Sequence, residues 1–167
     1  MKLAEEQEKV IALETYSRRE NLRFMNIPEQ TGENCIDTVY DIIENELKIS
    51  TDDIQFQAVH RVGRVRPAIN EQAKASPRPI IARFLLREER DYVLKAKNKL
   101  KKSEKYKDAY ITQDYARAVQ MERKTLIKAM FKAKEKGLDA RVVNRNLIVD
   151  NEVFHEGNIP DDLKASY

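Results

Sequence analysis

The stretch "TYSRRENLRFMNIPE", residues 15–29, contains the point at which the sequence changes from a helical to a strand pattern. Residues 21–27 alternate apolar side chains with others until Pro28, which is typical of a β-strand. Residues 1–20 instead repeat at seven-residue spacing, in two interleaved sets: Leu3, Val10, Ser17 and Glu6, Leu13, Glu20. This spacing predicts either the end of a coiled coil or a helix packed on its own domain. Two and a half heptads are too short to be stable alone, so we expect a longer helix upstream or association of several copies.

The next hundred residues alternate between strand and helix patterns. We predict, in order, a strand at 21–27, a helix at 34–49, strands at 53–64 and 79–86, a helix at 87–102 and a strand at 108–115. Residues 64–79 hold three of the five prolines and predict a long loop. The order β-α-β-β-α-β is that of a ferredoxin-like sheet with two helices on one face. We therefore expect an α+β fold.

The period changes again after residue 115. Apolar spacing predicts a long helix from Ala116 that ends at Gly137, followed by short strands within 139–154 and a weakly ordered tail from Glu156. The predicted domains are a coiled-coil end at 1–20, a sheet domain at 21–114, a small α+β domain at 115–155 and a tail at 156–167.

Positive charge is concentrated in the middle of the chain. Residues 60–107 carry 15 basic and 5 acidic residues, whereas 1–59 carry 6 and 13, and 108–167 carry 10 and 10. A basic block of this kind favours a polyanion-binding surface, because a phosphate backbone is bound through many summed contacts. The alternative is a solvated face whose lysines serve solubility.

The predicted sheet exposes arginines on its open face. Arg23 stands in the first strand where an RNA-binding sheet usually carries a stacking aromatic, and alternation turns Arg83 of the third strand outward. Three further arginines lie where the second strand leads into the loop and one lies where the loop meets the third strand, so that together with Arg83 they could rim a groove: Arg61, Arg64, Arg66 and Arg78. The alternative is a charged loop without a ligand. A basic face predicts binding through phosphates and indifference to base sequence.

Two other groups of basic residues are candidates. Arg18 and Arg19, at the seam between helix and sheet, could reach phosphates or form salt bridges with Glu14 and Glu20. On the last long helix, Arg123 and Lys124 lead a broad basic stripe that Arg141 extends, and this stripe could be a contact surface or a solvated face.

Several classes of function find no support in the residues. No nucleophile, P-loop or metal-binding motif is present, and the single cysteine, Cys35, excludes an internal disulfide. No apolar run reaches the length of a membrane span, and the N-terminus does not read as a secretory leader. We expect no enzyme activity, no cofactor and no membrane partner, in reducing intracellular surroundings.

The succession of short motifs resembles a known family. "YSRRENLRFMNIPE", "HRVGR", "RPIIARF", "ITQDY", "ERKTL" and "LIVDNEVF", spread over about residues 13–155, are similar to the RNA-binding protein encoded by the first open reading frame of LINE-type retrotransposons. The resemblance implies an N-terminal coiled coil that forms a homotrimer, a noncanonical RNA recognition motif and a small C-terminal domain. It also implies that RNA is contacted by Arg61, Arg64 and Arg123, in a cleft between the two domains.

The function implied by this resemblance is sequence-nonspecific binding of single-stranded RNA and DNA. The family's protein acts as a nucleic-acid chaperone in cytoplasmic ribonucleoprotein particles, with the nucleus as a second compartment. The alternative function is a coiled-coil protein-interaction module in a domesticated host protein, whose RNA-recognition-like sheet binds protein.

Overall fold

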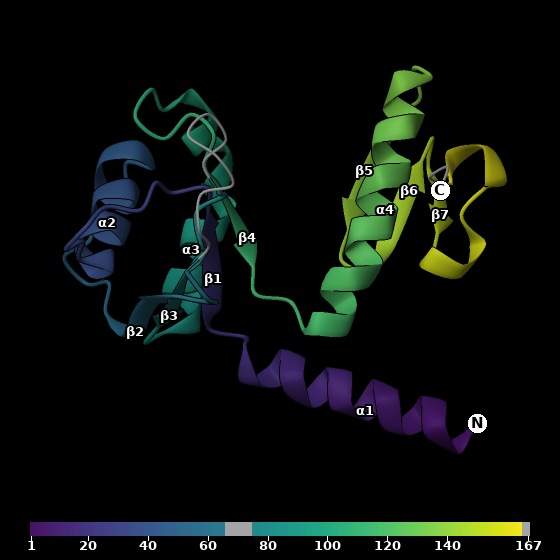
Figure 1. Ribbon diagram of the computed structural model, residues 1–167, viewed down its shortest axis with the longest axis horizontal. Helices are drawn as coiled ribbons and strands as arrows, with labels where there is room; N and C mark the ends of the chain where they lie inside the picture. The colour runs from purple at the N-terminus through teal and green to yellow at the C-terminus, as the bar shows by residue number, and fades with distance from the viewer. Residues whose placement is uncertain (66–74, 165–167) are drawn as a thin grey trace. The chain divides into compact units, whose positions relative to one another are not determined.

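A computed structural model describes residues 1–65 and 75–164 of the chain (Figure 1). The chain divides into two compact units. Tyr16–Asp114 form the first, here called the sheet unit, and Met1–Thr15 together with Tyr115–Tyr167 form the second unit. Each unit has its own buried apolar core. The predicted mixed α+β fold is confirmed.

The sheet unit contains four antiparallel strands. β1 (Asn21–Met25), β2 (Phe56–Arg61), β3 (Ile80–Phe84) and β4 (Tyr110–Gln113) lie side by side in the order β2-β3-β1-β4. Helix α2 (Cys35–Asp41) connects β1 to β2, and helix α3 (Arg87–Lys95) connects β3 to β4. β1 is therefore a central strand, with β3 and β4 on its two sides.

The alternation of side chains gives the sheet one covered face and one open face. The inward residues are fully or almost fully buried: Leu22, Phe24, Ile80, Ala82, Phe84 and Ile111. The helical segments supply Val39, Ile42 and Val93 to the same core. Burial of each large apolar side chain contributes about 1.5–3 kcal/mol. The residues between the inward positions, such as Arg23 and Arg83, accordingly project from the face that carries no helix.

Neither connecting helix is a regular α-helix over its whole length. The Asn34 side chain caps α2 by accepting hydrogen bonds from the backbone of Ile36 and Asp37, but a π-helical turn replaces the α-helix over Ile42–Glu46. This turn accompanies full burial of the adjacent residues Ile42 and Ile43. In the same way, α3 gives way to a 3₁₀ segment over Lys97–Lys102, which buries Leu100.

Strand β2 is shorter than the alternation predicts and contains a bulge. The register shifts between Phe56 and Ala58, so strict alternation fails there. Phe56 packs against the core beside Tyr40 and Phe84, with ring centres 5.1 and 4.8 Å apart, although alternation would place it on the same face as His60. The bulge lets an aromatic residue at the strand's start join the core while His60 stays exposed.

The second unit packs a long helix against a small sheet. Helix α4 (Arg117–Glu135) buries Leu126, Ala129 and Ala133 against β5 (Ala140–Val143) and β6 (Asn146–Val149), and β7 (Glu152–Phe154) completes the order β5-β6-β7. Gly137 follows α4 with a φ of +80°, the left-handed conformation that a glycine adopts without strain.

The segment after Glu156 is part of this core. Two 3₁₀ turns, at Glu156–Asn158 and Asp161–Leu163, bring in Ile159 and Leu163, whose exposed fractions are 4% and 3%. The expectation of a weakly ordered tail is wrong for residues 156–164, because these two apolar side chains fill space beside α4.

Helix α1 (Lys2–Ser17) buries none of its residues. Leu3, Val10 and Leu13 of the seven-residue pattern are 74%, 61% and 70% exposed. Among the described residues, no helix combines the length and the apolar character that crossing a membrane requires.

Candidate nucleic-acid interface

A hollow of about 480 Å³ lies on the open face of the sheet unit. The β1–β3 register places Asn21 opposite Arg83 and Arg23 opposite Ile81, which brings these side chains onto one surface. The segment that leads into β1 and the residue after β4 complete the wall. The lining residues are Ser17, Arg18, Asn21, Arg23, Ala58, His60, Val62, Ile81, Arg83 and Asp114.

The Asp114 carboxylate is the centre of this hollow. Its side chain is only 2% exposed, and its Oδ1 accepts hydrogen bonds from Nη1 of Arg18 at 3.0 Å and from Nε of Arg23 at 2.8 Å. Oδ2 accepts a third hydrogen bond from Nδ2 of Asn21 at 3.0 Å. A buried carboxylate requires such partners, because leaving its charge unpaired costs several kcal/mol. Asp114 thus fixes two guanidinium groups at the floor of the open face.

Two residues that line the hollow each have a buried polar atom without a hydrogen-bond partner among the described residues. Nε of Arg83 and Oδ1 of Asn21 make no hydrogen bond to any part of the chain within 1–65 and 75–164. A buried donor without an acceptor costs about 1–3 kcal/mol, so a bound acceptor would be stabilising. Three arginines against one aspartate also leave the hollow with an excess of positive charge. The arrangement is suited to an anion such as a phosphate group.

Arg61 is committed to the protein itself. Its side chain is 5% exposed, and each of its five N–H groups has an acceptor. Nε and Nη2 bind the Glu33 carboxylate at 2.8 and 3.0 Å, and the remaining hydrogen bonds go to the carbonyl oxygens of Ile27, Pro28 and Arg78. Arg61 therefore joins the end of β1 to both ends of the loop between β2 and β3.

The Glu33 carboxylate is stabilised in its charged form by this pair. Hydrogen bonding by Arg61 holds the pKa of Glu33 below its ordinary value, although partial burial acts in the opposite direction. A lowered pKa means that the pair contributes fully at neutral pH and loses its contribution only as the pH falls through the pKa of the folded state. At neutral pH Glu33 therefore keeps the negative charge that binds Nε and Nη2 of Arg61.

The other predicted loop arginines differ in their surroundings. Arg78 binds Glu29 at 2.7 Å and the Gly63 carbonyl oxygen. Arg64 is exposed and makes no hydrogen bond within the described part of the chain. Arg66 lies outside the described residues.

The two arginines at the seam have separate roles. Arg18 belongs to the Asp114 cluster. Nε of Arg19 lies 2.9 Å from a carboxylate oxygen of Glu20, and its guanidinium group stacks 3.7 Å from the centre of the Tyr16 ring. The seam thus contains a salt bridge from Arg19 to Glu20, one of the two acids expected to pair there.

The remaining candidates are in the second unit. Arg123 lies over the Tyr115 ring, 4.3 Å from its centre, and donates to the carbonyl oxygen of Asn144. Lys124 on α4 and Arg141 on β5 are both exposed. These three residues are not part of the open-face hollow.

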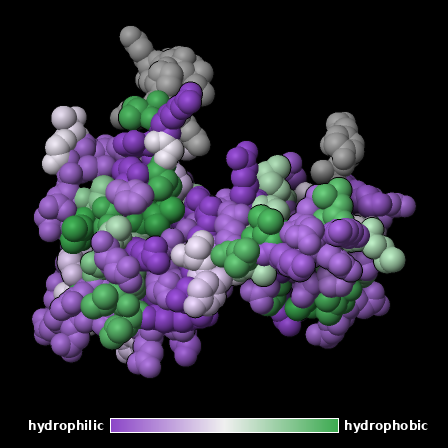
Figure 2. Space-filling view, turned by 90° about the horizontal axis from the view of Figure 1, so that it is seen from below, coloured by the Kyte–Doolittle hydropathy of each residue, from purple (hydrophilic) through white to green (hydrophobic). Residues whose placement is uncertain are grey.

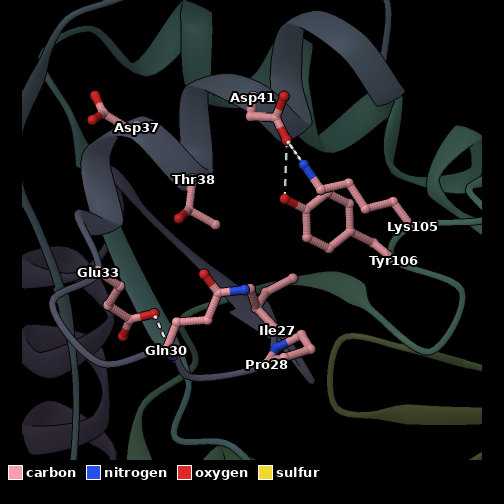
Figure 3. Close-up of a pocket in the computed structure, with 9 residues that line it drawn as sticks. All are labelled: Ile27, Pro28, Gln30, Glu33, Asp37, Thr38, Asp41, Lys105 and Tyr106. Atoms are coloured by element: carbon pink, nitrogen blue, oxygen red, sulfur yellow. Dashed lines mark hydrogen bonds and ion pairs between the residues drawn. The ribbon is translucent and has the colours of Figure 1, made fainter.

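A second hollow of the sheet unit has the opposite charge (Figure 3). It measures about 330 Å³, with Ile27, Pro28 and the Tyr106 ring among its apolar lining. Its charged residues are three acids and one base: Glu33, Asp37, Asp41 and Lys105. Figure 3 shows Lys105 and Tyr106 directed at Asp41, which they bind at 2.9 Å each. Excess negative charge makes this hollow unsuitable for a phosphate backbone.

Two residues of the open-face hollow are not predicted as site residues from the sequence. Asp114 follows an alternating strand and resembles an ordinary strand end, and Asn21 precedes the first inward residue. Their partnership is visible only when β1 and β4 are paired. Within the described ranges, no three His, Cys, Asp or Glu side chains come together as potential metal ligands. The sequence matches no model of a known protein family.

Replacement of Arg61 by alanine should destabilise the sheet unit and not merely weaken the binding of a ligand. The change leaves the Glu33 charge and three carbonyl groups without their donor, and we expect a loss of about 3 kcal/mol in the free energy of unfolding. Urea unfolding of Arg61→Ala measures this loss. Arg64→Ala is the matched control, because an exposed arginine with no partner in the described segments should change stability by less than about 0.5 kcal/mol. Equal stability of the two variants would contradict the structural role of Arg61.

Proposed function

We propose that the open face of the sheet unit binds single-stranded RNA and DNA without base specificity. The observation that carries this proposal is the Asp114 hollow: guanidinium groups held in place, a surplus of positive charge, and a buried Nε of Arg83 that has no acceptor among the described residues. A phosphate oxygen supplies both the negative charge and the hydrogen-bond acceptor that the hollow lacks. Arg18, Arg23 and Arg83 form the proposed contact set, to which exposed Arg64 is a candidate addition.

The chemistry of this face favours backbone contact over base reading. Guanidinium groups bind phosphates of any sequence, whereas base specificity needs side chains placed against base edges. Figure 2 shows one face of the molecule, on which apolar residues lie in patches among hydrophilic ones. The mostly polar and basic lining of the open-face hollow suits a hydrated polyanion better than a large apolar protein interface.

The wider proposal is that the sheet unit is a noncanonical RNA recognition motif of a LINE-type retrotransposon protein. The strand order β2-β3-β1-β4 and the placement of both helices on one face support it, together with the motif resemblance. Weak contacts that ignore base sequence also suit a nucleic-acid chaperone, since strands can then exchange while they remain bound. The proposed setting is a ribonucleoprotein particle in the cytoplasm, with the nucleus as a second compartment.

The exposed stripe of α1 supports self-association. Leu3, Val10 and Leu13 repeat with coiled-coil spacing, and the helix buries none of them. We propose that copies of the chain join through this helix as a homotrimer. The same stripe favours the second candidate function, a protein-interaction module, which differs in that the sheet would bind protein instead of nucleic acid.

Replacement of Arg83 by alanine should weaken nucleic-acid binding for all base sequences alike. We expect an affinity loss of about three- to tenfold near 50 mM salt, and a decrease of about 0.7 in the slope of log affinity against log salt, because one phosphate contact is lost. Anisotropy of labelled poly-U and mixed-sequence oligonucleotides over a salt series measures both quantities.

Arg87→Ala is the matched control, since Arg87 is exposed on α3 and its nearest charged partner, Asp91, is 3.9 Å away. It should leave affinity within about twofold of the unchanged protein, with a salt slope lower by much less than the 0.7 of one phosphate contact. The proposal fails if the unchanged protein does not bind, or if Arg83→Ala and Arg87→Ala behave alike.

A charge introduced into the α1 stripe should dissociate the oligomer. The double variant Val10→Asp/Leu13→Asp would bury two aspartates of each chain opposite the same residues of the other copies, in the interface between the α1 helices. Sedimentation equilibrium of this variant should give the mass of one chain. Ala12→Asp places one charge on the same helix outside the seven-residue pattern and should leave the oligomer intact. A single-chain mass for the unchanged protein would refute self-association through α1.

A further inference from the structure

Tyr110 provides an aromatic surface on the open face, at a position different from the expected ones. In the sequence, Arg23 and Arg83 occupy the strands that usually carry stacking aromatics. In the structure, Tyr110 opens strand β4 at the edge of the sheet and is 50% exposed. Its neighbours Ala109 and Ile111 are buried, so alternation directs Tyr110 to the same face as Arg23.

The surroundings of Tyr110 suit a flat apolar ligand. Met25 is its direct partner across the β1–β4 ladder, and such partners have adjacent side chains. The Tyr110 side chain makes no hydrogen bond and no ring contact with any residue of the described segments. The Tyr110 side chain therefore lies half-exposed to solvent beside a methionine.

The spacing relates this surface to the arginines. Tyr110 is two residues from Thr112, which pairs with Arg23, and two strand residues span about 7 Å. A single-stranded nucleic acid whose phosphate lies near Arg23 can accordingly place a neighbouring base over Tyr110. Stacking on a tyrosine tolerates any base, as does phosphate binding, because every base has an aromatic face.

We propose that Tyr110, backed by Met25, is a base-stacking platform of the open face. The platform binds an unpaired nucleobase of single-stranded RNA or DNA, and this inference rests on the proposed function of the same face. It explains how a sheet whose two central strands present no aromatic side chain on the open face can still engage bases. It also favours single strands over duplexes, whose bases are already stacked.

The test compares Tyr110 variants on two probes. One probe is a labelled single-stranded oligonucleotide, and the other has the same length with abasic sites throughout, which retains the phosphates but removes the bases. Tyr110→Ala and Tyr110→Thr should weaken binding to the first probe about tenfold and leave binding to the second unchanged. Tyr110→Phe keeps the ring and should stay within about twofold of the unchanged protein. Threonine retains strand propensity, so its agreement with alanine separates loss of the ring from damage to β4.

Tyr92→Ala is the matched control, because Tyr92 is 63% exposed but lies on α3. It should bind both probes as the unchanged protein does. The platform is refuted if the Tyr110 variants bind the first probe normally, or if they lose affinity equally for both probes. If the unchanged protein binds neither probe, the proposed function fails as well, whereas normal binding that is indifferent to Tyr110 refutes the platform alone.

Discussion

Burial of the Asp114 carboxylate is the constraint on which the open face depends. At 2% exposure this charge is tolerable only with donors around it, and Arg18, Arg23 and Asn21 supply them. The carboxylate ties the segment before β1 to the end of β4 through side chains that backbone pairing alone would leave mobile. The single negative charge of Asp114 offsets only one of the three arginines of the hollow, so positive charge remains for a ligand.

The arginines of this small sheet therefore have different roles, one structural and the other a candidate for ligand binding. Arg61 has no spare donor and braces the base of a loop, whereas Arg83 has a buried Nε without an acceptor. In the sequence both are arginines of neighbouring strands, and both were reasonable candidates for contact. The two differ in their surroundings: Arg61 forms an ion pair with Glu33 beside the loop, whereas no acid of the described residues forms one with Arg83.

Local pattern predicts much of this architecture. The alternation of Ile80, Ala82 and Phe84 against Ile81 and Arg83 assigns the two faces of β3, and the glycine after α4 marks its end. These features depend on neighbours in the sequence. The bulge at Phe56, the π-helical turn at Ile42 and the packed segment around Leu163 depend instead on space left by distant residues.

The candidate site was predictable only in part for the same reason. Arg23 and Arg83 follow from alternation within a strand. Asp114 and Tyr110 acquire their meaning from the pairing of β4 with β1, which joins residues about ninety positions apart. Without that pairing, Asp114 reads as a strand end and Tyr110 as an ordinary edge residue.

The most direct test of the open-face site is an NMR titration of the ¹⁵N-labelled protein with a short single-stranded oligonucleotide. The account predicts that the Nε–Hε signal of Arg83 and the backbone signals of β1 and β4 shift in proportion to occupancy. The side-chain signal of Arg61 and the backbone around Asp37 and Asp41 should not move. Shifts confined to α2 and the acidic hollow, or an unchanged Arg83 signal at saturation, would contradict the account.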